Sequence, residues 1–431
     1  MTTNTDNCSE ILVLASTFPR NEQQVTHPVY DLAKEVREKE PVNITVLAPH
    51  HPGSTKRETM DGINVRRCPY FFPNRFQKLC YEGGIFESIQ LNPLLALQLP
   101  FLFMSMFFYA AKTVHSKDID LIHTHWLVPA GLIGALLSKV TAIPHVMTLH
   151  AGGVLGVQRI PLNSIVCNFA YRNTNSFVPV SKYIQSKFED MVTCREKSSE
   201  AKFTIQPMCA DASHYEDYDK EQLRDKLGFQ QDVVGLFVGN FVTNKGIQYL
   251  VDAVERLDVE DNLFQLVMVG TGPLENRITK QVSNSKSANR IELTGFVSKE
   301  RLNKLYVAAD FVVVPSIVDS AGNTEGMPTV ISEAFVSRTP VIASDVGGIA
   351  DVVNDEENGY LVEQKRSDQL AQRMESLIGD PALSERLTKN AKETGKELTW
   401  EHCAQTYLRI YRNVNINVEV FDEDEALFPT Q

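Results

Sequence analysis

Short apolar segments alternate with amphipathic segments along the whole chain. In the first half, the apolar runs are rich in Val, Ile and Leu with little alternation, which is typical of strands in a parallel sheet covered on both faces. We predict these strands at 11–16, 44–49, 120–126, 145–151 and 176–181. Amphipathic stretches between them predict helices at 28–39 and 129–140. The first half therefore predicts one α/β unit.

The same pattern restarts near residue 233. Strands are predicted at 233–239, 264–270, 291–296, 311–316, 340–344 and 359–363. Helices are predicted at 246–257, 274–284, 298–308, 328–337 and 367–378. Two successive βαβα series predict two doubly wound, Rossmann-like parallel-sheet domains that face each other across a cleft.

A chain of 431 residues is long enough for two such domains. We place the first domain at 1–212 and the second at 213–396, with the acidic stretch 210–222 as the linker. The remaining segment, 397–431, contains a helix at 399–413 that we expect to pack back toward the first domain, followed by an acidic tail. Ligands of open α/β sheets bind at the carboxyl ends of the strands, so the cleft is the expected site.

Composition and charge exclude several classes of function. The hydrophobic content of 43% is that of an ordinary globular protein, and a net charge of −12 without a long Lys/Arg cluster argues against a nucleic-acid partner. The seven cysteines form no C-x-x-C pair, and the N-terminus resembles no secretory signal, so we expect reduced thiols and a cytoplasmic protein. His123 and His125 have no nearby acid to complete a metal site.

The stretch "NTEGMPTVISEA" at 323–334 places an acid on each side of a helix start. Pro328 favours the first helical position, so the backbone amides from Gly326 through Met327 to Thr329 are expected at the positive helix end, where anions bind. A diphosphate held there could place a sugar near Glu325 and a ribose near Glu333, since carboxylates accept hydrogen bonds from hydroxyls. A plainer interpretation is one acid that favours the helix dipole and one solvated glutamate.

Two glycine-containing loops follow strands of the second half. "FVGNFVTNKG" at 237–246 ends in Lys245 and Gly246, and a lysine there can neutralise a phosphate, although a surface lysine at a turn would look the same. "VGTGPLE" at 269–275 forms a second glycine turn that contains Gly272, without the third glycine of a dinucleotide fingerprint.

Together these motifs resemble the retaining glycosyltransferases of family 4, which have the two-domain GT-B fold. The resemblance covers nearly the whole chain and rests on these segments: "STFPR", "IHTHW", "TLHAGG", "VPVSKYI", the Lys-Gly loop, "GTGP", "EGMP…EA" and "DVGGIADVV…NGYLV". It implies that Glu325 contacts the transferred sugar, that Glu333 contacts the nucleotide ribose, and that His150 faces the donor sugar. His150 could instead be a core histidine with a backbone partner.

The resemblance also shows two departures. The family's phosphate clamp pairs an Arg with the Lys, and Asn240 stands at the Arg position while Lys245 is kept. Gly153 replaces an acid that many relatives carry. The implied donor site therefore consists of these residues: Asn240, Lys245, Gly272, Glu325, Gly326, Met327, Pro328, Thr329 and Glu333. His150, Glu325 and Lys245 are the implied catalytic residues.

The implied reaction is transfer of a hexosyl group, with retention, from a nucleotide-diphosphate sugar to a glycan or polyprenyl-linked glycan in polysaccharide or glycoconjugate biosynthesis. UDP is the first candidate nucleotide and GDP the second, and no metal or cofactor is expected because cations and amides hold the diphosphate. A sugar-nucleotide epimerase or a phosphorylase on the same two-domain plan is an alternative. A binding protein with a decayed site is another, favoured only by Asn240 and Gly153.

Residues 88–111 carry no charge, and 70–84 are aromatic with Arg67, Arg75 and Lys78 around them. By length the uncharged run could span a bilayer, but its polar residues and prolines argue against a span. It could also be a buried core helix. Aromatics with flanking cations favour a surface that lies on a membrane. Relatives often act on lipid-linked sugars at the cytosolic membrane face, so we expect a cytoplasmic protein that is peripheral on that face.

Overall fold

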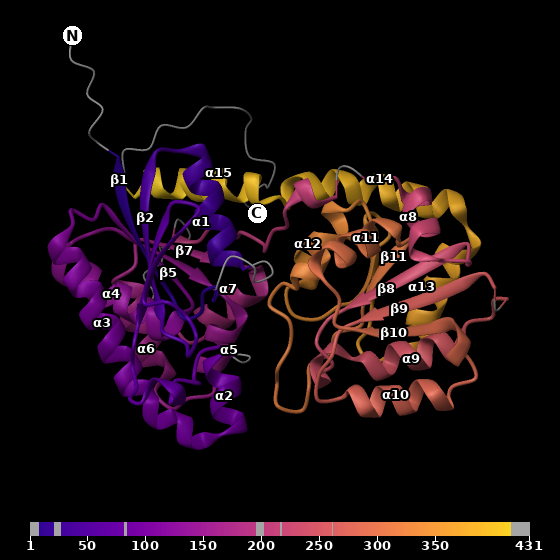
Figure 1. The fold of residues 1–431 in the computed structure, drawn as a ribbon, viewed down its shortest axis with the longest axis horizontal. Helices are drawn as coiled ribbons and strands as arrows, with labels where there is room; N and C mark the ends of the chain where they lie inside the picture. The colour runs from indigo at the N-terminus through magenta and orange to yellow at the C-terminus, as the bar shows by residue number, and fades with distance from the viewer. Residues whose placement is uncertain are drawn as a thin grey trace, which may run out of the picture.

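The computed structural model describes residues 8–20, 27–81, 84–194, 202–215, 218–260 and 262–414. The chain forms two α/β lobes that lie side by side, with the last helices running along one edge of both (Figure 1). The acidic tail at 417–431 lies outside the described residues.

The first lobe contains a seven-stranded sheet in the order β3-β4-β2-β1-β5-β6-β7. All neighbours are parallel except the antiparallel pair β3–β4. The strands are β1 (Ser9–Ala15), β2 (Val42–Pro49), β3 (Arg57–Met60), β4 (Ile63–Cys68), β5 (Leu121–His125), β6 (His145–Leu149) and β7 (Ser176–Pro179). The helices are α1 (Pro28–Lys39), α2 (Ile85–Leu91), α3 (Leu99–Ser116), α4 (Leu132–Thr141), α5 (Ala151–Gln158), α6 (Asn163–Arg172) and α7 (Lys182–Glu189).

The second lobe contains a fully parallel six-stranded sheet in the order β10-β9-β8-β11-β12-β13. Its strands are β8 (Val233–Val238), β9 (Phe264–Val269), β10 (Ile291–Gly295), β11 (Phe311–Val314), β12 (Val341–Ser344) and β13 (Gly359–Val362). Its helices are α8 (Lys220–Leu227), α9 (Ile247–Arg256), α10 (Glu275–Asn284), α11 (Lys299–Ala308), α12 (Thr329–Val336), α13 (Ser367–Gly379) and α14 (Pro381–Glu397). The predicted fold class of two doubly wound parallel sheets is confirmed.

Several elements differ from the prediction, including helices α5, α6, α7 and α8, where no helix was predicted. The hairpin β3–β4 was not predicted because its strands, "RETM" and "INVRRC", are charged and lie at the sheet edge. Helix α14 was also not predicted, because only Leu387, Ala391 and Gly395 of its 17 residues are buried. The helix predicted from residue 129 begins at Leu132, after a tight turn at Leu127–Gly131.

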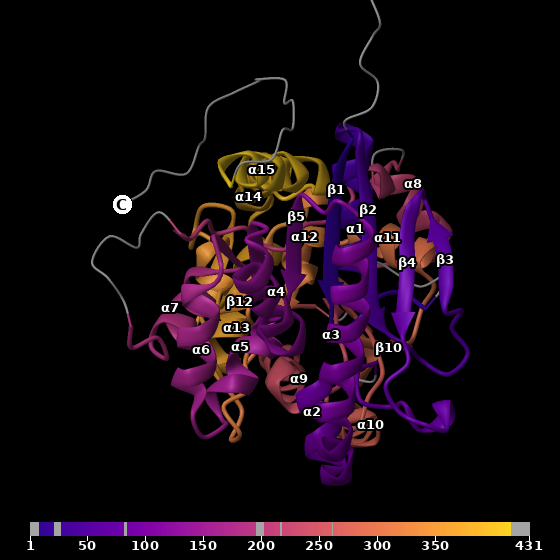
Figure 2. The same ribbon diagram turned by 90° about the vertical axis from the view of Figure 1, so that its left-hand side faces the viewer.

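The chain passes from one lobe to the other twice, near Ala210 and near Leu398. The two connecting segments are hydrogen-bonded to each other. The amide of Ala210 donates to the carbonyl of Leu398 at 2.9 Å, and the amide of Trp400 donates to the carbonyl of Ala210 at 3.1 Å. Helix α15 (Trp400–Asn413) then packs against α1 of the first lobe, and Figure 2 shows it above that lobe. The linker predicted at 210–222 is only partly irregular, because α8 begins at Lys220.

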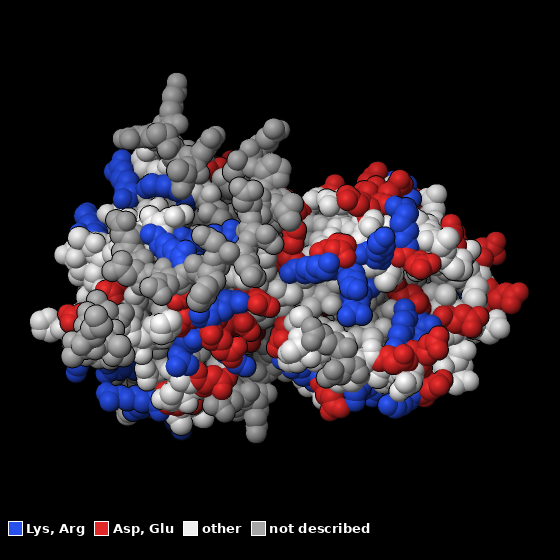
Figure 3. All heavy atoms as spheres, turned by 90° about the horizontal axis from the view of Figure 1, so that it is seen from above, with Lys and Arg blue, Asp and Glu red and all other residues white. Residues whose placement is uncertain are grey.

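Acidic and basic side chains are interspersed on the face seen in Figure 3. Within the described ranges, no group of three or more His, Cys, Asp or Glu residues is placed to hold a metal ion. His123 is hydrogen-bonded to Thr148 and Tyr411 instead.

The apolar run at 88–111 forms the end of α2, a short 3₁₀ helix at Pro93–Gln98 and most of α3. The segment Pro93–Ser116 is long and apolar enough to cross a membrane, with a mean hydropathy of 1.8. One side of α3 is buried through Leu102, Met106 and Ala110. The opposite side exposes Phe101, Met104 and Phe108, so interpretation as a fully buried core helix is wrong.

Candidate active site

The implied site residues lie on loops that follow the carboxyl ends of strands in both lobes, except Thr329 and Glu333, which lie in α12. His150 directly follows β6 and occupies the N-cap position of α5. Lys245 lies between β8 and α9, and Glu325 lies between β11 and α12. The fold therefore brings together, at the facing ends of the two sheets, residues that are up to 175 positions apart.

Lys245 is fixed by a close contact between backbones. Gly246, the next residue, has φ +64°, and a Cβ atom there would lie 1.9 Å from the carbonyl oxygen of Pro315. The amide of Ile317 also donates to the carbonyl of Asn244 at 2.8 Å. Only glycine allows this conformation and this approach, so the lysine loop is held against the segment that leads to Glu325.

Glu325 forms an ion pair with that lysine. Its Oε1 lies 2.8 Å from Nζ of Lys245 and 3.3 Å from the hydroxyl of Ser316, which donates to it. The two charged side chains are 20% and 12% exposed, so the pair is largely withdrawn from solvent. Position 347 also requires glycine. Gly347 has φ +63°, and a Cβ atom there would lie 1.9 Å from the carbonyl oxygen of Glu325.

Helix α12 begins one residue later than predicted. Pro328 is the N-cap residue, with ψ 126°, and Thr329 is the first helical residue. The amides of Gly326, Met327 and Thr329 donate to no acceptor in the part of the chain that the structure describes. They stay available at the positive helix end, as expected for an anion site.

Glu333 lies one turn inside α12 and is partly buried. Its Oε2 accepts a hydrogen bond of 2.6 Å from the hydroxyl of Tyr306 on α11. Burial raises the pKa of the Glu333 carboxyl, while the Tyr306 hydrogen bond and the charge of Lys299 act in the opposite direction. The other carboxylate oxygen remains available to a ligand hydroxyl.

The other two donor-site residues lie in the glycine loops of the second lobe. The side chain of Asn240 is exposed and supplies no charge. Gly272 lies so close to the neighbouring loop that a Cβ atom would be 2.8 Å from the amide nitrogen of Phe241. The loops after β8 and β9 are therefore packed on each other beside Lys245.

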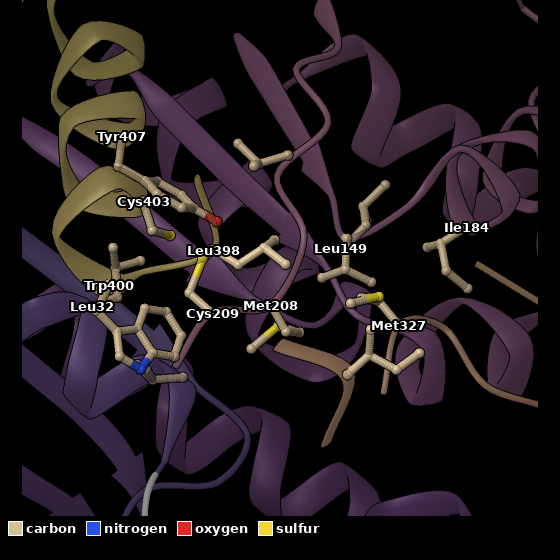
Figure 4. Packing of buried hydrophobic residues seen from close by; sticks show 14 of the residues in the cluster. Leu32, Leu149, Ile184, Met208, Cys209, Met327, Leu398, Trp400, Cys403 and Tyr407 are labelled. Atoms are coloured by element: carbon tan, nitrogen blue, oxygen red, sulfur yellow. The ribbon is translucent and has the colours of Figure 1, made fainter. Parts of the chain in front are cut away.

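The two lobes touch across the site. A Cβ atom on Gly326 would lie 2.5 Å from Cβ of Ala151, the residue after His150. Leu149, Ile184 and Met327 belong to one apolar cluster at this contact (Figure 4). Arg159 donates to Oδ1 of Asn323 at 2.7 Å, which links α5 to the loop before Glu325. The segment that directly follows His150 therefore packs against the loop that carries Glu325.

Burial keeps the imidazole of His150 neutral. It lowers the pKa of His150 to about 3, and the nearby His27 contributes in the same direction. The ring contacts His125, whose Nδ1 is 3.1 Å from His150 Nε2, and Trp126, at a centroid distance of 4.5 Å. His150 is buried, as the interpretation as a core histidine expects, but its hydrogen-bond partner is the side chain of His125 and not the backbone.

Several residues of this site were not found from the sequence. His125 was considered only as a metal ligand. No separate sequence signal indicated Tyr306, which binds Glu333, or Ser316, which binds Glu325. The same holds for the glycines at 347 and 348. A Cβ atom on Gly348 would lie 1.9 Å from the carbonyl oxygen of Gly326. A glycine pair in "DVGG" is the one local signal that could have indicated this close approach.

Two facing α/β domains, with the site between the carboxyl ends of their strands and a last helix that returns to the first domain, define a protein of the GT-B class. Two family models match the chain: "Glycosyltransferase Family 4" at residues 25–199 and "Glycosyl transferases group 1" at 219–394. An uncharacterized glycosyltransferase of Methanocaldococcus jannaschii is 30% identical over 302 residues, which cover 70% of this chain and 78% of that protein. The chain belongs to the family 4 glycosyltransferases, and it is an enzyme of that class.

Further relatives and solved structures agree with this assignment. A putative teichuronic acid biosynthesis glycosyltransferase of Bacillus subtilis is 30% identical over 266 residues, covering 61% of this chain and 62% of that protein. Sucrose-phosphate synthase from Thermosynechococcus elongatus has the same fold, with a TM-score of 0.73 at 22% identity over 94% of this chain and 99% of that one. HepE of Anabaena, solved with UDP, has a TM-score of 0.69 at 21% identity over 94% of this chain and all of that one.

Proposed function

We propose that this enzyme transfers a hexosyl group, with retention, from a nucleotide-diphosphate sugar to a glycan or a polyprenyl-linked glycan in polysaccharide or glycoconjugate biosynthesis. The observation that carries the proposal is the Lys245–Glu325 ion pair beside the free amides of α12, next to the contact with the segment that follows His150. A cation, a carboxylate and the amides that follow the carboxylate in sequence therefore lie close together. UDP is the first nucleotide to test, because a protein of the same fold binds it, and GDP is the second.

The residues match the charges that develop in this reaction. Cleavage of a sugar–phosphate bond builds positive charge on the anomeric carbon and negative charge on the leaving diphosphate. Lys245 and the amides of Gly326, Met327 and Thr329 stabilise the diphosphate. A single preorganised donor of this kind contributes about 3 kcal/mol to transition-state stabilisation. The same groups would hold the diphosphate without a metal, as we expect for this chain.

The two glutamates bind different parts of the donor. Glu325 contacts the sugar hydroxyls next to the diphosphate, and its charge is oriented by Lys245 and Ser316. Glu333 accepts hydrogen bonds from the ribose, since Tyr306 holds only one of its carboxylate oxygens. His150, which is neutral, faces the sugar from the first lobe. The acceptor hydroxyl attacks from the side on which the diphosphate leaves and passes its proton to the leaving phosphate, so the anomeric configuration is retained.

The exposed side of α3 supports a proposal for the acceptor and the cellular location. Phe101, Met104 and Phe108 lie three to four residues apart on one side of the helix and are all exposed. Leu91, Leu94 and Leu97 extend this apolar surface onto the preceding segment. We define these six residues as the α3 surface. An exposed apolar helix side of this kind fits a membrane interface, so we propose that the enzyme is peripheral on the cytosolic face and acts there on a lipid-linked acceptor.

Calorimetric titration of the purified protein with UDP and GDP tests the donor site. We expect micromolar binding of one nucleotide and its loss in Lys245→Ala. Lys304→Ala is the matched control, because Lys304 forms an exposed ion pair with Glu300 on α11 and takes no part in the site. If neither nucleotide binds, Asn240 marks a broken clamp and the binding-protein alternative is preferred. Release of free sugar nucleotide isomers without an acceptor would identify an epimerase.

A further inference from the structure

His125 is the last residue of β5, and His150 directly follows the last residue of the adjacent parallel strand β6. In the β5–β6 pairing, His125 is in register with Thr148, two residues before His150. Nδ1 of His125 lies 3.1 Å from Nε2 of His150, within hydrogen-bond distance. Trp126 also packs against the His150 ring, at a centroid distance of 4.5 Å. His125 is thus the only hydrogen-bond partner of the His150 imidazole among the residues that the structure describes.

Both imidazoles are neutral, so their hydrogen bond has a direction. Burial lowers the pKa of His150 to about 3 and holds the pKa of His125 well below its ordinary value, with neighbouring histidines adding to both effects. A neutral imidazole carries one N–H donor and one acceptor nitrogen. One ring must therefore donate while the other accepts, and the tautomer of His125 determines the tautomer of His150.

The surroundings of His125 favour a proton on its Nδ1. The small cavity beside the two histidines is lined largely by apolar groups, including Leu32, Met208 and Trp400. Nε2 of His125 has no hydrogen-bond partner within the described ranges. A buried N–H group without a partner is rarer in proteins than an acceptor without one, so the proton is better placed on Nδ1, where His150 accepts it.

A rigid layer behind His125 fixes its ring. His123 packs on it at a centroid distance of 4.3 Å. Both nitrogens of His123 are engaged, with the Thr148 hydroxyl at 2.9 Å and the Tyr411 hydroxyl at 2.8 Å. The Tyr407 hydroxyl lies 2.7 Å from the same threonine hydroxyl. Two tyrosines of the returning helix α15 therefore support the histidine layer of the first lobe.

We propose that His125 is a positioning residue: its Nδ1–H donates to Nε2 of His150 and leaves the Nδ1–H of His150 to face the donor sugar. This inference rests on the proposed function, in which His150 contacts that sugar. Without His125, the His150 ring can adopt the other tautomer, which presents a lone pair where the sugar hydroxyl needs a donor. Orientation by a second hydrogen bond is how proteins fix histidine ligands and bases in other sites.

Three substitutions separate the hydrogen bond from the bulk of the side chain. In His125→Asn, the amide nitrogen is bonded to Cγ as Nδ1 is, so the donor is kept. In His125→Gln, the amide nitrogen falls near the Nε2 position, and His125→Leu removes the donor. We expect the Asn variant to stay within about fivefold of the wild-type kcat, and the Gln and Leu variants to lose about 10- to 100-fold in kcat. The KM for the donor and the affinity for the nucleotide should be unchanged in all three.

The tautomer of His150 can be observed directly. Long-range ¹H–¹⁵N correlation spectra of protein labelled at histidine distinguish the two neutral tautomers, and His150→Asn assigns the signal by its disappearance. We expect the Nδ1–H tautomer in the wild type and in His125→Asn, and the Nε2–H tautomer or a mixture in His125→Leu. A wild-type His150 in the Nε2–H form overturns the proposal, and so does a fully active Leu variant.

The spectra keep this inference separate from the proposed function. If the wild type neither binds a nucleotide nor transfers a sugar, the proposed function fails, while the spectra still decide what His125 does to His150. If the wild type is active and the Asn variant is as impaired as the Leu variant, the proposed function stands and the role of His125 is refuted. Thermal unfolding of each variant identifies any loss of activity that results from misfolding.

Discussion

Nζ of Lys245 lies 2.8 Å from Oε1 of Glu325, although the two residues belong to loops that follow different strands. The pair holds both loops in the cleft and places a cation beside a carboxylate at the start of α12. Because both charges are largely withdrawn from water, removal of one leaves the other without its counter-ion. A substitution at either position therefore changes the charge balance as well as one contact, and each needs a control that keeps the shape of the side chain.

Substitutions of the two glutamates should affect different quantities, the rate of transfer for Glu325 and the affinity for nucleotide for Glu333. Glu325→Ala should lower the rate of transfer by about 100-fold or more while nucleotide affinity changes little, because the lost contact is to the sugar. Glu333→Ala should mainly weaken nucleotide binding, since the lost contact is to the ribose. Initial rates with the donor and calorimetric titration with the free nucleotide separate these effects.

Glu325→Gln and Glu333→Gln are the matched controls for size. Tyr306→Phe adds a third test, because it frees the second oxygen of Glu333 without removing the carboxylate, and it should change nucleotide affinity far less than Glu333→Ala. Equal and mild effects of both alanine substitutions on rate and affinity would refute the division of roles.

Substitution of Gly246, the residue after Lys245, should lower both the stability of the protein and its affinity for nucleotide. Gly246→Ala places a Cβ atom 1.9 Å from the Pro315 carbonyl oxygen at φ +64°, so the loop must move away. We expect the free energy of unfolding to fall by about 2 kcal/mol or more and nucleotide binding to be lost with the displaced lysine. Urea unfolding and calorimetric titration measure the two effects.

Gly379→Ala is the matched control for this prediction. Gly379 is the last residue of α13, and a Cβ atom there would meet no atom within 4 Å. Alanine is the better helix former, so stability should be unchanged or slightly increased. A Gly246→Ala variant that is as stable as Gly379→Ala and binds nucleotide normally would show that the two loops are not packed as described.

The buried histidines should make the protein sensitive to mild acid. The pKa values of His123, His145 and His150 are lowered by burial to about 3, and that of His27 to about 4. Unfolded histidines bind protons below about pH 6.5, while these do not in the folded state, so stability falls as pH drops from 6.5 toward 4. Each histidine contributes about 2 kcal/mol of this loss at pH 5 relative to pH 7.5.

Carboxyls whose pKa values are raised by burial oppose this effect, and Asp31 is the example with the largest shift. Burial raises the pKa of Asp31 to about 6, so the folded state binds that proton more readily and gains stability as pH falls through 6. The free energy of urea unfolding should therefore depend less steeply on pH in His145→Gln and more steeply in Asp31→Asn. His145 is suitable because its ring nitrogens are hydrogen-bonded only to Thr124 and Thr174 in the described structure. Equal slopes in the wild type and both variants would contradict the assignment.

The sequence predicted the strands of both sheets except β3 and β4, because burial on two faces requires runs of Val, Ile and Leu. It did not predict β3, whose Arg57 and Glu58 fit a sheet edge as well as a loop. Nor could it predict α14, which has a narrow buried stripe on an otherwise polar surface. In both cases tertiary contacts, and not local preference, determine the structure.

For the site, the motifs indicated Glu325, Glu333, Lys245 and His150, but not the contacts between them. The Lys245–Glu325 pair joins residues 80 positions apart. Nothing in the local sequence around either residue indicates that the two side chains are in contact. The interpretation of His125 as a candidate metal ligand considered only neighbours in sequence, while its partner His150 is 25 positions away on the next strand. Contacts of this kind depend on strand order and register, which local periodicity does not specify.

Binding of the enzyme to membranes should depend on the α3 surface. Met104 is 68% exposed, and Phe108 lies four residues further along the same side of the helix. Glutamate at these positions costs little stability because neither side chain is buried, but it places charge where acyl chains would lie. We therefore expect Met104→Glu/Phe108→Glu to fold and transfer to a soluble acceptor normally, while losing flotation with anionic liposomes.

The control must be an equally exposed apolar residue elsewhere on the same lobe. Val140 is 66% exposed at the end of α4, outside the α3 surface, so Val140→Glu should float like the wild type. Wild-type protein that remains at the bottom of the gradient with anionic vesicles contradicts the membrane proposal but leaves the donor site untouched. Flotation that Val140→Glu abolishes equally would mean that added negative charge, and not the apolar side of α3, controls binding. Loss confined to the double variant would assign the membrane contact to α3.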